Sequence, residues 1–120
     1  MNKVIVILVK NIHWFIRIVI ASTFIYHGYP KVLDPSGLIN MGLPTFLSYL
    51  VGPFEFFGAI FLILGGFFSS NLTRIGAVLI SIIMLGAIFL VHFNDGWAGI
   101  EWQLLILSNC LFFIIKGNDI

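Results

Sequence analysis

The sequence predicts an all-α protein, an integral membrane four-helix bundle with a short interfacial helix in the first outer loop. Two features of the composition support this. Hydrophobic residues make up 60% of the 120 positions and charged residues only 9%, against about 45–50% and about 25% in an average soluble domain. A chain this short would leave much of that apolar surface exposed in water. The third observation is the presence of four apolar segments of roughly the length that crosses about 30 Å of hydrocarbon.

The first span is predicted at residues 12–29, where it would end at the turn-forming sequence Gly28-Tyr29-Pro30. No small-residue cleavage site follows the apolar residues 4–9, so we expect them to extend this helix rather than to form a signal peptide. A long connection follows the span. Its apolar residues 43–50, with Pro44 near the front, are too short to cross a membrane and are predicted to form the interfacial helix.

The second span is predicted at residues 52–68, with Pro53 in the first turn, where its missing N–H costs little. The third, at residues 72–93, follows the capping residue Ser69. The fourth, at residues 100–115, is the shortest and precedes Gly117, a residue typical of helix C-termini. Residues 1–120 are therefore expected to form a single transmembrane domain.

The basic residues predict the orientation of the bundle, because cytoplasmic loops carry an excess of Lys and Arg. Four spans place both termini on one side, and that side would hold Lys3, Lys10, Arg74 and Lys116, whereas the other would hold only Lys31. The N- and C-termini are therefore predicted to be cytoplasmic. Arg17, just inside the first span, is expected to extend to the cytoplasmic headgroups or to bond helix-end carbonyls.

Each predicted span carries one protonatable residue at its outer end: His27, Glu55, His92 and Glu101. Ionisable groups within spans are costly, so they normally face the bundle interior and mark function. On the fourth span, Glu101 and Ser108 lie seven residues apart and share a helix face. We therefore expect the four side chains to converge on a polar pocket that opens outward. The alternative is that the carboxylates only cap helix N-termini and the histidines only belong to the membrane interface.

Other functional classes find little support. The net charge is +1 and the basic residues form no cluster, so no nucleic-acid partner is predicted. Cys110 is the single cysteine, which excludes an intramolecular disulfide or a redox-active pair and suggests an inert core residue. Two histidines and two carboxylates on four helices could bind a transition metal, but the Glu-x-x-His pairing of di-iron bundles is absent, and no metal ligands are predicted.

Several short motifs occur in a characteristic order. They are Arg17; His27-Gly28 followed by Lys31; Gly52-Pro53-Phe54-Glu55 with Gly58 and Leu64-Gly65; Arg74 with Met84 and Ala87; His92; Glu101; and Lys116-Gly117. In this order and spacing the chain resembles the DoxX-like (DoxX/DoxD) membrane proteins over essentially its whole length. The resemblance implies a four-helix protein of the bacterial inner membrane. Some relatives resemble the membrane subunit of a thiosulfate:quinone oxidoreductase, and others are partners of a sulfurtransferase and a superoxide dismutase in oxidant defence.

Carried onto this chain, the resemblance implies a functional cluster. The residues expected to act as proton carriers are His27, Glu55, His92 and Glu101, and the same four with Lys31 are expected to bind a quinone headgroup. The Phe-rich helices would supply an apolar slot for the ring and tail. The first hypothesis is therefore a quinone-linked redox subunit, with electrons from another subunit or a soluble donor. The alternative is a non-enzymatic accessory subunit that packs against a larger membrane complex, so enzymatic activity stays an open question.

Overall fold

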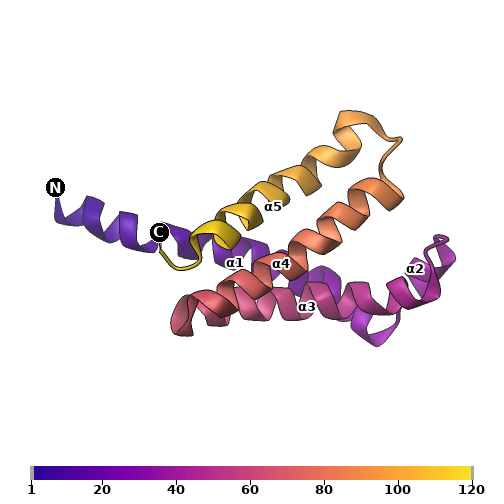
Figure 1. Cartoon of the computed structure of the whole chain (residues 1–120), viewed down its shortest axis with the longest axis horizontal. Coiled ribbons are helices and arrows are strands. Elements are labelled where there is room, and N and C mark those ends of the chain that lie inside the picture. The colour runs from indigo at the N-terminus through magenta and orange to yellow at the C-terminus, as the bar shows by residue number, and fades with distance from the viewer. Residues whose placement is uncertain (1, 120) are drawn as a thin grey trace.

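The computed structural model describes residues 2–119 and consists of helices, with no strand in that range (Figure 1). Four helical segments are long and apolar enough to cross a membrane. They are α1 (Lys3–Leu33), α3 (Thr45–Phe68), α4 (Ser70–Gly86) with its π-helical continuation η1 (Ala87–Val91), and α5 (Gly96–Lys116). The prediction of an all-helical membrane protein with four spans is confirmed, and the chain is a multi-pass membrane protein.

Several helix ends lie where the sequence predicts them. The hydroxyl of Ser69 accepts a hydrogen bond from the backbone N–H of Leu72 at 3.2 Å, so it caps α4. Gly117 follows α5 with a positive φ of 58°, which suits glycine at a helix C-terminus. The N-terminal apolar residues belong to α1, which begins at Lys3. The predicted extension of the first helix is therefore confirmed.

Pro30 does not follow the end of the first helix, and Pro53 does not lie at the start of the second, as predicted. Helix α1 continues through Gly28 and Pro30 to Leu33, and Pro53 lies inside α3 rather than in its first turn. Residues 45–50, predicted to belong to the interfacial helix, instead form the first turns of α3. Membrane helices tolerate proline because neighbouring groups satisfy the freed carbonyls, whereas ending a helix in hydrocarbon would leave several backbone groups unpaired.

The connection between α1 and α3 does contain a short helix, but it is α2 (Ser36–Asn40), nearer α1 than predicted. Asp34 precedes it and its carboxylate accepts a hydrogen bond from the backbone N–H of Ser36 at 3.0 Å. This bond to the charged form lowers the pKa of the Asp34 carboxyl from its ordinary value. The turn between α1 and α2 is therefore fixed by local hydrogen bonding.

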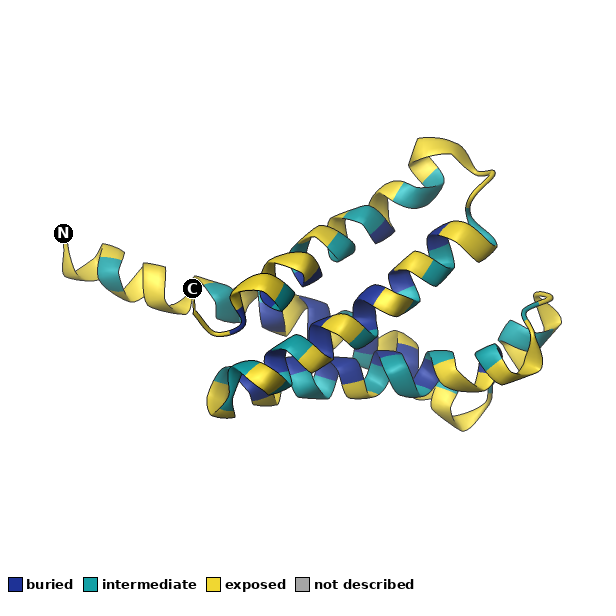
Figure 2. Cartoon of the chain, viewed as in Figure 1, coloured by how far each residue is buried: buried dark blue, intermediate teal, exposed yellow. Residues whose placement is uncertain are grey.

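The spanning helices pack in chain order: α1 lies along α3, α3 along α4, and α4 along α5 (Figure 1). Their inner faces form one buried core, whereas the N-terminal part of α1 extends past the other helices and is exposed (Figure 2). The core residues are Ile20, Ala21, Phe24, Ala59, Leu62, Ala77, Ile80, Met84, Cys110 and Phe113. At 31 residues, α1 is about 46 Å long by the usual helical rise, which exceeds the hydrocarbon thickness.

Glycines set how closely α3 and α4 approach. A Cβ atom on Gly76 would lie 2.6 Å from the backbone nitrogen of Leu62 and 2.7 Å from the carbonyl oxygen of Gly58. Small residues at this contact let the two backbones touch, as is usual between membrane helices. Helices α3 and α4 are close where they join at Ser69 and diverge toward the other end (Figure 1). We call the end with α2 and residues 92–95 the cavity end, and the opposite end the tail end.

Candidate functional site

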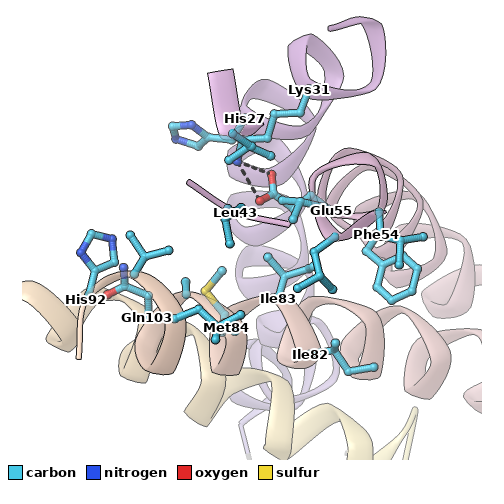
Figure 3. Close-up of a pocket in the computed structure, with 18 of the residues that line it drawn as sticks. His27, Lys31, Leu43, Phe54, Glu55, Ile82, Ile83, Met84, His92 and Gln103 are labelled. Atoms are coloured by element: carbon cyan, nitrogen blue, oxygen red, sulfur yellow. Dashed lines mark hydrogen bonds and ion pairs between the residues drawn. The ribbon is translucent and has the colours of Figure 1, made fainter. Parts of the chain in front are cut away.

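A cavity of about 460 Å³ lies at the cavity end of the bundle. Its walls come from α1, the connection with α2, α3, α4 with η1, and α5, and most of the lining side chains are aliphatic or aromatic. Five polar residues interrupt this apolar lining: His27, Lys31, Glu55, His92 and Gln103. Figure 3 shows the Lys31–Glu55 pair on one wall and His92 beside Gln103 on another. An apolar cavity with a few polar groups is the usual form of a small-ligand site.

The charged wall of the cavity is an ion pair between α1 and α3. The ammonium nitrogen of Lys31 lies 2.9 Å from Oε1 and 3.1 Å from Oε2 of Glu55. The Glu55 side chain is 4% exposed and that of Lys31 is 30% exposed. Two glycines bring the helices together here, because a Cβ on Gly52 would lie 2.6 Å from the nitrogen of Val32 and one on Gly28 would lie 2.9 Å from the Cβ of Glu55. The close backbone contact therefore positions the pair.

A second polar pair lies at the rim. His92 follows η1, and its Nδ1 lies 2.8 Å from Oδ2 of Asp95 in the turn before α5. A carboxylate at Nδ1 fixes the orientation of the ring and favours a proton on that nitrogen. π-helical turns within α-helices occur often at functional sites, because the extra residue in the turn redirects the side chains that follow. The structure thus adds Asp95, which was not predicted from the sequence, as the hydrogen-bond partner of His92.

His27 and Glu101 occupy different surroundings from the other predicted residues. His27 lines the cavity but is exposed, with its ring centroid 6.3 Å from that of Trp102. Glu101 is exposed and is not among the residues that line the cavity. The expectation that all four protonatable side chains converge is therefore wrong at Glu101. The structure brings His27, Lys31, Glu55 and His92 around one space, and their catalytic and cofactor-binding roles stay predictions, as does the role of Glu101.

The inward face of α5 differs from the predicted one. Its buried residues are Gln103, Cys110 and Phe113, whereas both Glu101 and Ser108 are exposed. The Ser108 hydroxyl donates to the carbonyl of Leu105 at 2.7 Å, so its own helix satisfies it and no interior partner is needed. The hydrogen-bonding geometry assigns the Gln103 amide nitrogen to the side facing the first turn of α5, where it donates to the carbonyls of Gly99 and Ile100 at 3.1 and 3.2 Å. Gln103 is the polar residue that α5 contributes to the cavity, and it was not predicted from the sequence.

Arg17 forms a separate polar cluster at the tail end. Its guanidinium donates to the carbonyl of Leu62 at 2.7 Å, to Thr73 Oγ1 at 2.9 Å, and to Asn118 Oδ1 at 2.9 Å. Its Nε donates to His13 Nδ1 at 2.9 Å, one helical turn away. Arg17 is fully buried, so of its two expected roles the extension to the headgroups is wrong, whereas a bond to a helix carbonyl is found at Leu62 of α3. A buried guanidinium needs acceptors for its five N–H groups, and this cluster supplies four of them.

No three metal-binding side chains of the types His, Cys, Asp and Glu come together within residues 2–119. The alternative of a metal centre therefore gains no support from this part of the chain. Comparison with curated proteins and with solved structures yields no match. The sequence profile of the DoxX family matches residues 13–93. The chain belongs to the DoxX family. The match to DoxX takes in His27, Lys31, Glu55 and His92, which are the predicted site residues that line the cavity.

Proposed function

We propose that this DoxX-family protein binds a quinone in the cavity and serves as a membrane subunit of a redox system. The observation that carries the proposal is a mainly apolar cavity of about 460 Å³ whose wall holds a buried ion pair. A quinone has a flat apolar ring, two carbonyl oxygens that accept hydrogen bonds, and usually an apolar tail. The volume falls within the usual range for small-ligand sites, about 300–1,000 Å³.

The polar side chains present suit such a headgroup. An ammonium group has three N–H donors, and the distances from Lys31 to both Glu55 oxygens occupy at most two of them. The remaining donor of Lys31 would bind a quinone oxygen, while Glu55 holds the ammonium in place and balances its charge. His92 would serve the far side of the ring, and the Gln103 carbonyl oxygen would accept a hydrogen bond from a hydroxyl of the reduced quinol. When bound, the quinone would supply the capacity to accept two electrons and two protons.

His92 is the proposed proton carrier at the rim. Asp95 holds Nδ1 of the ring at 2.8 Å, which leaves Nε2 as the nitrogen free to accept or donate a proton toward the cavity. The single cysteine, Cys110, is buried in the core, so electrons must come from a partner protein or a soluble donor. The ligand-sized cavity favours this redox role over that of an accessory subunit that only packs against a larger complex.

The proposal includes an orientation in the bacterial inner membrane. Lys10, Arg74 and Lys116 belong to the tail half of the bundle, and Lys31 belongs to the cavity end. By the positive-inside rule, the termini would be cytoplasmic and the cavity would lie near the outer surface. A donor of electrons on that side would then be an extracytoplasmic protein or a small periplasmic reductant.

Quinone binding to the purified protein tests the proposal. We expect a quinone with a short isoprenoid tail to bind the wild-type protein in nanodiscs, and Lys31→Met and Glu55→Gln each to weaken binding by about tenfold or more, the loss of roughly one charge-assisted hydrogen bond. Glu101→Gln is the matched control, because it removes a carboxylate outside the cavity, and it should bind as the wild type does. Equal affinity in all four proteins, or no binding to the wild type, would contradict the proposal.

A further inference from the structure

The cavity has an apolar opening between α3 and the end of α4. Residues that both line the cavity and remain exposed mark where it meets its surroundings. On this side they are Leu50 of α3, Ile82 of α4 and Leu90 of η1, whose exposed fractions are 42%, 49% and 62%. Ile82, Gly86 and Leu90 succeed one another at intervals of four, so they form one edge of the opening.

The opening lies at membrane depth. Ile82 precedes Val91, the last residue of η1, by nine positions, and Phe54 follows the first residue of α3 by nine. At the usual rise per residue, each lies roughly 13 Å from its helix end, so the opening reaches well into a hydrocarbon layer about 30 Å thick. The part of the opening beside Ile82 therefore faces acyl chains, and a ligand that passes there comes from the bilayer.

The polar groups of the cavity lie elsewhere on its wall. Lys31 and Glu55 form their pair between α1 and α3, and His92 and Gln103 lie beside each other at the other end (Figure 3). Every residue that edges the opening from α3, α4 or η1 is apolar or glycine. A ligand that fits both regions has a polar head and an apolar extension. Its head lies farther inside the cavity than its tail, which lies in the opening.

We infer that the ligand enters sideways from the bilayer through the opening between α3 and α4–η1, and that its hydrocarbon tail remains there while its head lies against Lys31 and Glu55. This inference deepens the proposed function, on which it rests, by assigning the ligand to the class of long-tailed, membrane-dissolved quinones. Water-soluble, tail-less quinones would lack the contacts in the opening.

Gly86 permits a direct test. It is the last residue of α4, has ordinary helical backbone angles, and a Cβ placed on it would meet no atom within 4 Å. A large side chain at this position would therefore fill the opening without displacing the fold. Gly37 in α2 offers the matched control, because a Cβ there also meets nothing within 4 Å and the residue does not line the cavity.

The experiment measures the binding of two probes in nanodiscs of one lipid composition. The probes share one quinone head, and one carries a decyl tail while the other carries none. We expect the wild type to bind the tailed probe more tightly. Gly86→Phe should weaken binding of the tailed probe by about tenfold and change that of the tail-less probe much less, whereas Gly37→Phe should alter neither.

Other results would contradict either the inference or the proposed function. If the wild type binds both probes equally, or if Gly86→Phe weakens neither or both alike, the lateral opening does not hold the tail and the inference fails while quinone binding stands. An opening occupied by a bilayer lipid would give the first of these patterns. If the wild type binds neither probe, the proposed function fails and the inference fails with it. Ile82→Phe narrows the same edge and replaces Gly86→Phe if thermal unfolding shows that variant to be misfolded.

Discussion

The two members of the Lys31–Glu55 pair differ in exposure, at 30% and 4% of their side chains. Removing Lys31 would leave a buried carboxylate without its partner, whereas removing the Glu55 charge would leave an ammonium that reaches solvent. We expect Lys31→Met to lower the free energy of unfolding by about 3–5 kcal/mol, and Glu55→Gln to lower it by only about 1–2 kcal/mol. Thermal unfolding in one detergent measures both.

The double variant Lys31→Met with Glu55→Gln provides the control for this asymmetry. Because it buries no unpaired charge, it should be more stable than Lys31→Met alone. Equal losses from the two single changes, or additive losses in the double variant, would show that the pair is not buried as the structure has it.

The buried surroundings of Arg17 also allow a specific prediction about stability. Arg17→Met keeps much of the side-chain volume but leaves Thr73 and Asn118 without their charged donor. We expect it to lower the free energy of unfolding by at least about 2 kcal/mol, since buried polar groups lose a partner. Lys10→Met, an exposed cation of the same helix, is the control and should be nearly neutral. Unchanged stability in Arg17→Met would refute the buried cluster.

At the scale of helices, the closest contact is that of α3 with α4. A Cβ at Gly76 would meet backbone atoms of Leu62 and Gly58, which cannot move as a flexible side chain can. Gly76→Ala should therefore destabilise the protein by about 1–3 kcal/mol, the usual cost of overpacking. Gly86→Ala, on the same helix with open space around it, should be neutral or slightly stabilising. Calorimetry or thermal unfolding measures the stability of both variants. If Gly86→Ala were the less stable of the two, the close contact of α3 with α4 at Gly76 would be contradicted.

The four spanning helices could be predicted from the sequence. The helix ends near the two prolines and the buried face of α5 could not. Long apolar segments and the capping residue Ser69 reveal the four spans. The prolines at positions 30 and 53 mislead, because the turn signals they represent apply to helices in water. The face of α5 was predicted from Glu101 and Ser108 on the assumption that polar residues point inward. Ser108 bonds its own helix instead, and the buried face is set by Phe113 and Cys110.

At the scale of the whole molecule, the proposed orientation makes a topological prediction. In a Cys110→Ala background, Ser36→Cys lies in the connection before α3, and Asp119→Cys lies beyond α5. A membrane-impermeant maleimide added to intact spheroplasts should label Ser36→Cys at once and Asp119→Cys only after the membrane is broken, since cytoplasmic ends carry the basic excess. The opposite order of labelling would invert the protein and move the cavity to the cytoplasmic side.

The candidate site could be predicted only in part. Histidine, lysine and glutamate near the ends of apolar spans indicate His27, Lys31, Glu55 and His92, because charges in a membrane need a reason to be there. Asp95 and Gln103 were not predicted, because an aspartate in a turn and a neutral amide are not unusual at these positions. The spacing of His13 and Arg17, one helical turn apart, was a usable sign of the tail-end cluster. Asn118 gave none, because its role depends on where the chain end folds back.

Photolabelling with an azido-quinone, followed by peptide mapping, would show whether a membrane quinone occupies the cavity formed by α1, α3, α4, η1 and α5. We predict crosslinks on residues 47–55 and 82–92, with labelling suppressed by excess unmodified quinone and reduced in Gly86→Phe. Labelling spread over lipid-facing residues such as Phe15 and Phe67, and insensitive to competitor, would contradict quinone binding in the cavity.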